Sequence, residues 1–189
     1  PKQFIGGIFI AIAMTGLDVS PKMLKQAREK ARRAKARVRW IRGDMTDFRI
    51  HRRYGAILLP MNTVQHLLTA GQLRAMVTCA HRHLRPGGLF ALDVYNPKAA
   101  KLGRKVFYPV FRYRHPAGPG WVDVWVRNQF KSDEINRVTF EHRLSGRIIF
   151  RERLRLKCYL PGQLDRALRE GGFVILRKLG GFDGRRFSE

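Results

Sequence analysis

The feature that most constrains the fold is an alternation of short apolar runs with longer amphipathic stretches from Ile8 to about residue 97. Apolar runs at 8–18, 38–41, 54–59 and 89–95 have the length and composition of buried strands. Two of the intervening stretches repeat apolar residues at three- and four-residue spacing, as amphipathic helices do. Because strands that alternate with helices form βαβ units, this half of the chain predicts an α/β, Rossmann-like, doubly wound sheet.

Capping residues mark the ends of the two predicted helices. Ser20 followed by Pro21 supplies an N-cap and a proline at the first helical position, and Thr69 caps the second helix. The second helix is expected to end at Arg85–Gly88, because proline cannot continue a helix and glycine tolerates the left-handed turn.

The hydrophobic period changes after residue 97. Residues from about 106 to 160 alternate apolar and polar side chains, with turn-forming residues at 116–120, 132–133 and 145–146. This pattern predicts an antiparallel β-meander, followed by a short helix from Pro161 and a return strand over 173–179.

These changes divide the chain into three parts. Residues 1–97 form the predicted Rossmann-like cofactor-binding core, and residues 98–160 an antiparallel extension that serves as an acceptor lid or in dimerisation. Residues 161–189 are a helix and strand that return to the core.

The charge of the chain is strongly positive. The 189 residues include 38 Lys and Arg against 14 Asp and Glu, which gives a formal net charge of +24. Such a charge predicts attraction to RNA or another polyanion, and it is equally typical of a solvated arginine-rich surface.

The cysteines and the hydropathy of the chain indicate the cellular compartment. Cys79 and Cys158 are far apart and form no C-x-x-C, so neither a disulfide framework nor a metal site is predicted. No apolar stretch reaches the roughly 20 residues of a transmembrane helix, so no membrane contact is expected. We therefore expect a protein of a reducing compartment, the cytoplasm.

Ligands of doubly wound sheets bind at the carboxyl ends of the strands. Here those ends carry Asp18, Asp44, the segment 59–62 and Tyr95. A carboxylate at such a position can accept hydrogen bonds from both hydroxyls of a ribose, and a turn or helix-cap role is the alternative for Asp18.

Four segments follow one another in the predicted core: Gly16–Leu24, Gly43–Phe48, Tyr54–Leu59 and Leu84–Phe90. Their order resembles the class I S-adenosylmethionine-dependent methyltransferases. The later segments Tyr159–Leu164, Gly172–Phe173 and Gly180–Gly184 resemble members whose sheet carries an antiparallel extension over the acceptor pocket, so the resemblance covers nearly the whole chain.

The resemblance implies S-adenosylmethionine as cofactor and assigns its contacts by residue. Asp18 would bind the ribose hydroxyls and Asp44 the adenine amine. The other contacts would be Val19 and Met23 beside the adenine, the backbone of Met45 at a ring nitrogen, and Leu59 and Pro60 flanking the methionine part.

The resemblance also implies an acceptor side formed by Met61, Asn62 and Gln65. Methyl transfer needs no side-chain nucleophile, but an amine or hydroxyl acceptor must lose a proton. The candidates to accept that proton are His66, Tyr95 and Tyr159, with a surface histidine and two core tyrosines as the alternatives.

One family feature is missing. The family begins with a strand and a G-x-G-x-G loop that approaches the cofactor, whereas only Gly6-Gly7 precedes Gly16 here. We therefore expect a sheet truncated at its first strand, through natural degeneration, a shortened gene product or a change of reading frame. Weak cofactor binding or none is expected, and a homodimer would cover the unpaired sheet edge.

Three functions follow from these observations. The antiparallel extension favours a methyltransferase of small molecules. The basic stretches Lys22–Arg37 and Arg147–Lys157 keep open an RNA methyltransferase, or a non-catalytic methyltransferase-like module that binds nucleic acid. A dinucleotide oxidoreductase is disfavoured, because its pyrophosphate would need the same missing loop.

Overall fold

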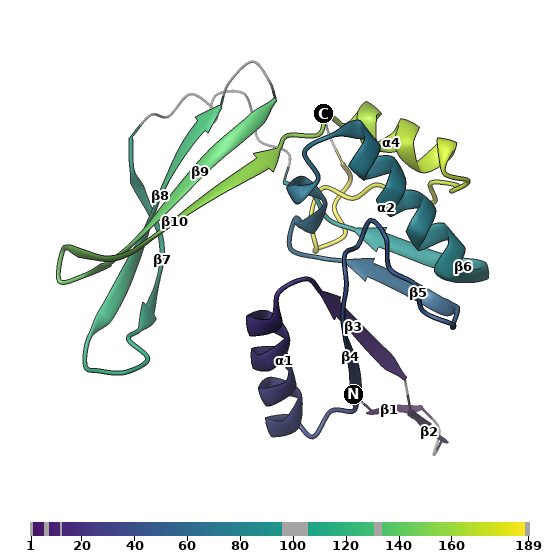
Figure 1. Ribbon diagram of the computed structural model, residues 1–189, viewed down its shortest axis with the longest axis horizontal. Helices are drawn as coiled ribbons and strands as arrows, with labels where there is room; N and C mark the ends of the chain where they lie inside the picture. Colours follow the sequence, from purple (N-terminus) through teal and green to yellow (C-terminus); the bar gives the residue numbers. More distant parts are fainter. Residues whose placement is uncertain (1, 6–7, 12, 96–105, 131–133, 188–189) are drawn as a thin grey trace.

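The computed structural model describes residues 2–5, 8–11, 13–95, 106–130 and 134–187. Its core consists of β3 to β6 with the helices α1, α2 and α4, and a separate four-stranded arm of β7 to β10 stands beside the core (Figure 1). The predicted boundary between core and extension, at residues 97 and 98, lies outside the described residues.

Two parallel strand pairs form the centre of the core. β3 (Met14–Asp18) pairs with β4 (Val38–Arg42), and β5 (Tyr54–Leu59) pairs with β6 (Leu84–Leu92). Within the described part of the chain the two pairs belong to separate sheets. The Tyr54 hydroxyl at the start of β5 donates a hydrogen bond of 3.0 Å to the Thr15 hydroxyl on β3. A side-chain contact therefore joins the pairs where a continuous sheet would have a backbone ladder.

The segment before β3 differs from the predicted single strand over 8–18. β1 (Lys2–Ile5) and β2 (Ile8–Ala11) pair antiparallel as a hairpin, and β3 begins anew at Met14. The backbone groups of β2 thus find their partners within the hairpin rather than beside β3. Gly6-Gly7, the remnant of the glycine loop, lies outside the described residues.

Helix α1 (Pro21–Arg33) begins where the sequence predicts. The Ser20 hydroxyl accepts the Met23 amide at 3.3 Å, and Pro21 occupies the first turn. Leu24 is the buried residue of this helix, while its other faces carry the basic side chains.

Helix α2 (Ala70–His83) forms the centre of the hydrophobic core. Thr69 and Gln72 complete a capping box at its start. The predicted apolar stripe is buried: Leu73, Met76, Val77, Ala80 and Leu84. The helix ends at His83, and β6 begins at once with an irregular register at Pro86–Gly88, where Gly87 has a φ of 72°. The predicted turn is therefore an irregularity inside the strand.

Helix α4 (Pro161–Glu170) packs against α2 (Figure 1). A Cβ on Gly171 would lie 2.2 Å from a methyl group of Val77, so only glycine fits this contact. The return strand predicted over 173–179 does not form: in this described segment the ladder is reduced to an isolated bridge from Leu179 to Arg186. Phe173 packs on Phe90 of β6, and the segment after it makes no ladder.

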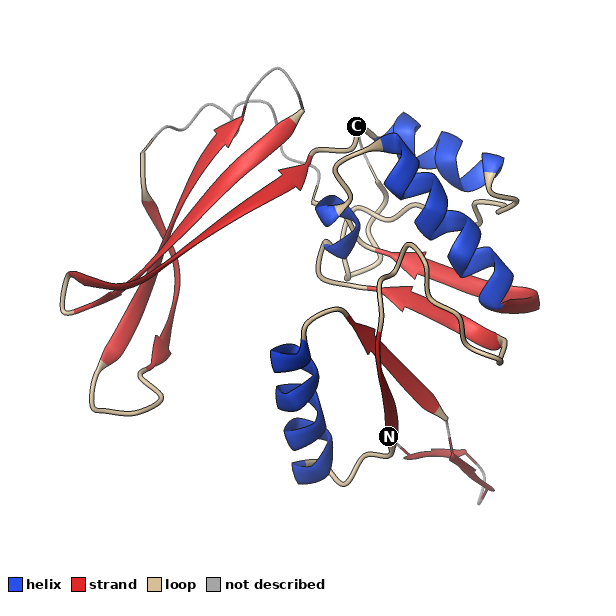
Figure 2. Cartoon of the chain, in the orientation of Figure 1, coloured by secondary structure: helices blue, strands red, loops and turns tan. Residues whose placement is uncertain are grey.

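The arm confirms the predicted meander. Its strands are β7 (Tyr108–Arg114), β8 (Trp121–Phe130), β9 (Ile135–Leu144) and β10 (Arg147–Lys157), all antiparallel in the spatial order β10-β9-β8-β7. Figure 2 shows this sheet as a long twisted ribbon of strands without a helix on it.

The two faces of the arm differ in chemistry. Val122, Val124 and Val126 of β8 are buried beneath neighbouring side chains on one face. The opposite face interleaves tryptophans with arginines: Arg112 and Arg114 lie against the Trp121 ring, and Arg143 against Trp125. Cation–π contacts of this kind hold guanidinium groups flat on the sheet.

A buried carboxylate anchors this second face. Glu141 is 2% exposed and accepts hydrogen bonds from the guanidinium groups of Arg143 and Arg151, the latter at 2.6 Å. Burial raises the pKa of Glu141, but the two arginines outweigh it and hold the pKa below 4.5. The ionised carboxylate is therefore the form that the folded arm prefers.

This arrangement predicts a pH dependence of stability. Because the pKa of Glu141 is depressed on folding, its contribution is complete above the unfolded value and is lost as the pH falls through the lower folded value. Glu141→Gln should make the arm less stable at neutral pH and remove part of the acid dependence below about pH 4.5. Acid unfolding followed by tryptophan fluorescence measures both. Glu152→Gln, at an exposed carboxylate of β10, is the control, and equal effects of both variants would contradict the assignment.

Candidate functional site

The carboxyl ends of β3 and β4 bring two predicted site residues together. Asp18 ends β3, and its backbone carbonyl accepts the Gly43 amide at 3.1 Å, so Asp44 follows directly beside it. Oδ1 of Asp18 accepts the Ser20 amide at 2.7 Å. Oδ2 has no hydrogen-bond partner among the described residues. Asp18 is thus a turn residue, as the alternative interpretation held, with one carboxylate oxygen left for a ligand.

Asp44 is held in the same way by the turn that follows it. Its Oδ1 accepts the backbone amide of Thr46 at 2.8 Å and the Thr46 hydroxyl at 2.7 Å. These hydrogen bonds, the backbone one first, lower the pKa of Asp44. Each aspartate therefore presents a carboxylate at the same edge of the sheet. One oxygen of each carboxylate is held by hydrogen bonds within its own turn. Met45 is half-buried and packs against the hydrophobic core.

The loop after β5 is held in an unusual conformation. Met61 and Asn62 have φ values of 62° and 56°, in the left-handed region that favours glycine. Asp93, directly after β6, accepts the Met61 amide with Oδ1 at 2.7 Å and the Asn62 amide with Oδ2 at 2.9 Å. This bidentate contact offsets the strain of the loop and fixes its position.

Asp93 is a site residue that sequence reasoning missed. The strand was predicted to run on to Tyr95, which would place Asp93 inside it, whereas β6 ends at Leu92. The available signal was an aspartate at the end of an apolar run, the same signal that identified Asp18.

Apolar side chains surround the carboxyl ends of the strands. Leu59 is half-buried against the core, and Pro60 is exposed. Val19, Met23 and Met61 are exposed as well, Met61 to 83%. Exposed large apolar side chains beside two carboxylates are typical of a ligand surface rather than of a solvated loop.

Gln65 lies apart from this surface. It is 2% exposed, and its amide nitrogen donates to the backbone carbonyls of Tyr95 at 3.3 Å and Lys157 at 3.1 Å. The side chain expected on the acceptor side instead joins the 3₁₀ helix η1 (Thr63–His66) to the end of β10. Gln65 therefore links the core to the arm, and its expected place on the acceptor side stays a prediction.

The three candidate proton acceptors occupy different environments. Tyr159 is buried, its hydroxyl donates to the Leu67 carbonyl, and burial raises its pKa to about 12, which favours the alternative of a core tyrosine. Tyr95 is partly exposed, and desolvation, followed by the neighbouring Tyr108 and Cys158, raises its pKa. His66 is exposed at the end of η1, close in sequence to the loop that Asp93 holds.

Neither a metal site nor a membrane helix occurs in the described part of the chain. No three His, Cys, Asp or Glu side chains there lie close enough to hold a metal ion. No described helix has the length and apolar character needed to cross a bilayer.

Comparison with known sequences finds similarity in the first half of the chain. Residues 8–88 match the family model described as a methyltransferase domain. Over 78 residues the chain is 35% identical to a dTDP-3-amino-3,4,6-trideoxy-alpha-D-glucopyranose N,N-dimethyltransferase of Streptomyces venezuelae. That match covers 41% of this chain and 31% of the relative, so it spans about a third of the relative's length.

Solved structures show the same fold over nearly the whole chain. An S-adenosylmethionine-dependent methyltransferase from Clostridium acetobutylicum has a TM-score of 0.76 and 21% identity, covering 94% of this chain and 71% of that one. An amino pentose methyltransferase from Micromonospora echinaspora with bound S-adenosylmethionine has a TM-score of 0.72 and 22% identity, over 92% and 71%. The chain therefore has the fold of the class I S-adenosylmethionine-dependent methyltransferases, arm included.

The role of Asp93 can be tested by exchange of backbone hydrogens. Asp93→Ala removes both acceptors of the Met61 and Asn62 amides, so the loop should open more often. Exchange at these two amides should become faster by about tenfold or more, as measured by NMR. Asp123→Ala, which removes a carboxylate paired with Arg112 on the arm, is the control. Unchanged exchange in Asp93→Ala would show that the backbone holds the loop by itself.

Proposed function

We propose that this chain acts as an S-adenosylmethionine-dependent methyltransferase on a small-molecule acceptor. The observation that carries the proposal is the pair of carboxylates, Asp18 and Asp44, fixed side by side directly after two adjacent parallel strands. The family match over residues 8–88 and the shared fold support it.

The adenosine half of the cofactor fits these residues. Oδ2 of Asp18 is available to the ribose hydroxyls, and the second oxygen of Asp44 to the adenine amine. Val19 and Met23 offer exposed apolar surface for the base. The backbone of Met45 remains the proposed contact of a ring nitrogen.

The methionine half fits less well. Leu59 and Pro60, at the end of β5, are the proposed flanking residues, but the described residues supply no glycine-rich turn in the space between strands β3 and β5. The hairpin β1–β2 occupies the chain before β3. Because backbone amides of such a turn would supply part of the affinity, we propose that the isolated chain binds the cofactor weakly.

The chain's own contribution to the reaction is alignment and proton transfer. When bound, the cofactor would supply an activated methyl group. An acceptor nitrogen or oxygen would attack the methyl carbon in line while the carbon–sulfur bond breaks and the thioether leaves, so no protein nucleophile is required. The loop at Met61 and Asn62, held by Asp93, would orient the acceptor. His66 is the proposed proton acceptor, and Tyr95 would orient the acceptor through its neutral hydroxyl.

The names of two similar proteins support the choice of an acceptor class. One is named as an N,N-dimethyltransferase of a dTDP-amino sugar and another as an amino pentose methyltransferase. We propose a sugar amine as acceptor. The cytoplasm is the proposed compartment, where the buried thiols of Cys79 and Cys158 stay reduced.

Calorimetry of the whole chain with S-adenosylhomocysteine tests the proposal. We expect saturable binding with a dissociation constant on the order of 1 mM, weakened about tenfold by Asp18→Ala because the ribose loses its acceptor. Glu152→Ala, at an exposed carboxylate of the arm, should bind as the unaltered chain does. The absence of binding at about 10 mM ligand, or equal affinity in Asp18→Ala, would contradict the proposed site.

A second copy of the chain is the proposed partner of the arm. Phe111 and Phe150 are exposed on the same face of the arm, on its two edge strands β7 and β10, although apolar side chains of this size are usually covered in a folded protein. A homodimer through this surface would bury them. Sedimentation equilibrium should show a dimer at tens of micromolar chain, which Phe111→Ser with Phe150→Ser converts to monomer; a monomer before substitution would contradict it.

RNA remains the second candidate acceptor. Helix α1 favours it, because its exposed faces carry a dense array of cations and its first turn has no acidic residue. In that case methylation by this chain would require an RNA substrate and would weaken steeply with salt.

A further inference from the structure

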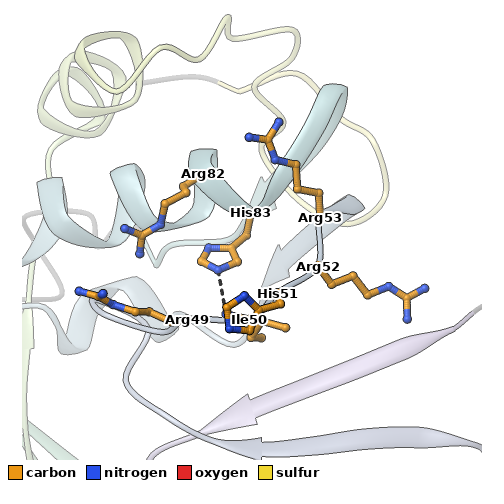
Figure 3. A pocket seen from close by; sticks show the side chains of 7 residues that line it. All are labelled: Arg49, Ile50, His51, Arg52, Arg53, Arg82 and His83. Carbon is orange, nitrogen blue, oxygen red and sulfur yellow. Dashed lines mark hydrogen bonds between the residues drawn. The ribbon is translucent and has the colours of Figure 1, made fainter.

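A hollow lined by cations lies at the edge of the core opposite to the candidate site. The strand β5 runs from Tyr54 to Leu59, so the segment before Tyr54 lies at its amino end and the Pro60 loop at its carboxyl end. The hollow has a volume of about 550 Å³. Figure 3 shows the seven side chains that line it: Arg49, Ile50, His51, Arg52, Arg53, Arg82 and His83.

The floor of the hollow is rigid. His83, buried at the end of α2, accepts the Ile50 amide with Nε2 at 3.1 Å, so its Nδ1 donates to the Cys79 carbonyl at 2.8 Å. The Phe48 ring packs in a tilted orientation against the same imidazole, with 4.2 Å between centroids and 36° between the ring planes. These contacts fasten the loop 49–53 to the helix and fix the backbone from which the arginines project.

The charge of the hollow is largely unbalanced. Arg49 approaches Asp47 at 3.8 Å, and both side chains are mostly exposed, so this pair is weak. Arg82 donates to the Phe48 carbonyl, which carries no net charge. Among the described residues no carboxylate pairs with Arg52, Arg53 or Arg82. Of the four guanidinium groups, only that of Arg49 has a carboxylate partner among the described residues, and this pair is weak.

The directions of the guanidinium groups indicate whether a compact or an extended anion would fit the hollow. In Figure 3 Arg49 and Arg82 point to one side of His83, Arg53 points above it and Arg52 points away to the other side. They do not converge on one point, as they would around a single phosphate. An anion with charges spaced along its length would satisfy them together.

A second basic hollow lies at the same edge of the core. It is lined by Arg28 and Arg32 of α1 and by Trp40, next to Val38 at the amino end of β4. Arginine matches phosphate oxygens in a bidentate manner, and a tryptophan ring offers a surface on which a base can stack. Two such hollows at the amino ends of parallel strands favour an extended ligand over a compact one.

We propose that the loop 49–53 and the end of α2 form a docking surface for the phosphodiester backbone of single-stranded nucleic acid, separate from the cofactor edge. The surface holds the strand by charge and by bidentate arginine contacts, without reading its sequence. It does not depend on the methyltransferase activity, because it lies at the opposite ends of the strands.

Fluorescence anisotropy with a labelled oligouridylate of about twelve nucleotides tests the proposal. Arg49→Gln, Arg52→Gln and Arg53→Gln together should weaken binding by about tenfold or more. The slope of log affinity against log salt, between about 50 and 200 mM, should become shallower by about 2, since each lost phosphate contact contributes about 0.7.

A charge-matched control separates a local site from general attraction. Arg74→Gln, Arg166→Gln and Arg169→Gln remove the same three charges from exposed positions of α2 and α4. This variant should bind with less than about a twofold loss. Equal losses in both triple variants would overturn the proposal in favour of diffuse charge. Displacement of the oligouridylate by polyglutamate at equal anion concentration would overturn it in favour of an acidic protein. Unchanged thermal unfolding of both variants shows that the fold is retained.

Discussion

The interruption of the sheet between β3 and β5 is the constraint on which the rest of the structure depends. In a doubly wound sheet of the order 3-2-1-4-5-6, strand 1 lies between strands 2 and 4. Here β3 and β5 correspond to strands 2 and 4, and no described strand lies between them. Backbone groups along the facing edges of β3 and β5 consequently lack a ladder. The Tyr54–Thr15 hydrogen bond and the loop between the pairs hold them in place of it.

This interruption divides the candidate site into a complete half and an incomplete half. The carboxylates of Asp18 and Asp44 belong to the β3–β4 pair, whose internal ladder is intact. The Pro60–Asn62 loop belongs to the β5–β6 pair and is fixed from within it by Asp93. Each pair therefore positions its own residues without the other. The surface that would lie between them, which we propose for the methionine part of the cofactor, is the one to which the described residues contribute no glycine-rich turn.

The features that depend on neighbouring residues in the sequence, namely helix caps, apolar stripes and strand alternation, were predicted correctly. Ser20 and Thr69 capped the helices as expected, the apolar stripe of α2 was buried, and the meander formed. Side-chain roles that depend on distant partners were not predictable. Gln65 meets a carbonyl 92 residues away on β10, and a strand end shifted by three residues concealed Asp93. The antiparallel pairing of β1 with β2 was missed because one apolar run fits either arrangement.

The central claim is that the carboxyl ends of β3, β4 and β5 form one ligand surface. Titration of the isotope-labelled chain with S-adenosylhomocysteine, followed by amide NMR shifts, tests it most directly because weak binding remains visible. The account predicts saturating shifts at 18–19 and 44–45, smaller shifts at 60–62, and none in the basic loop 49–53. Shifts confined to that loop or to the arm, or none at about 10 mM ligand, would contradict it.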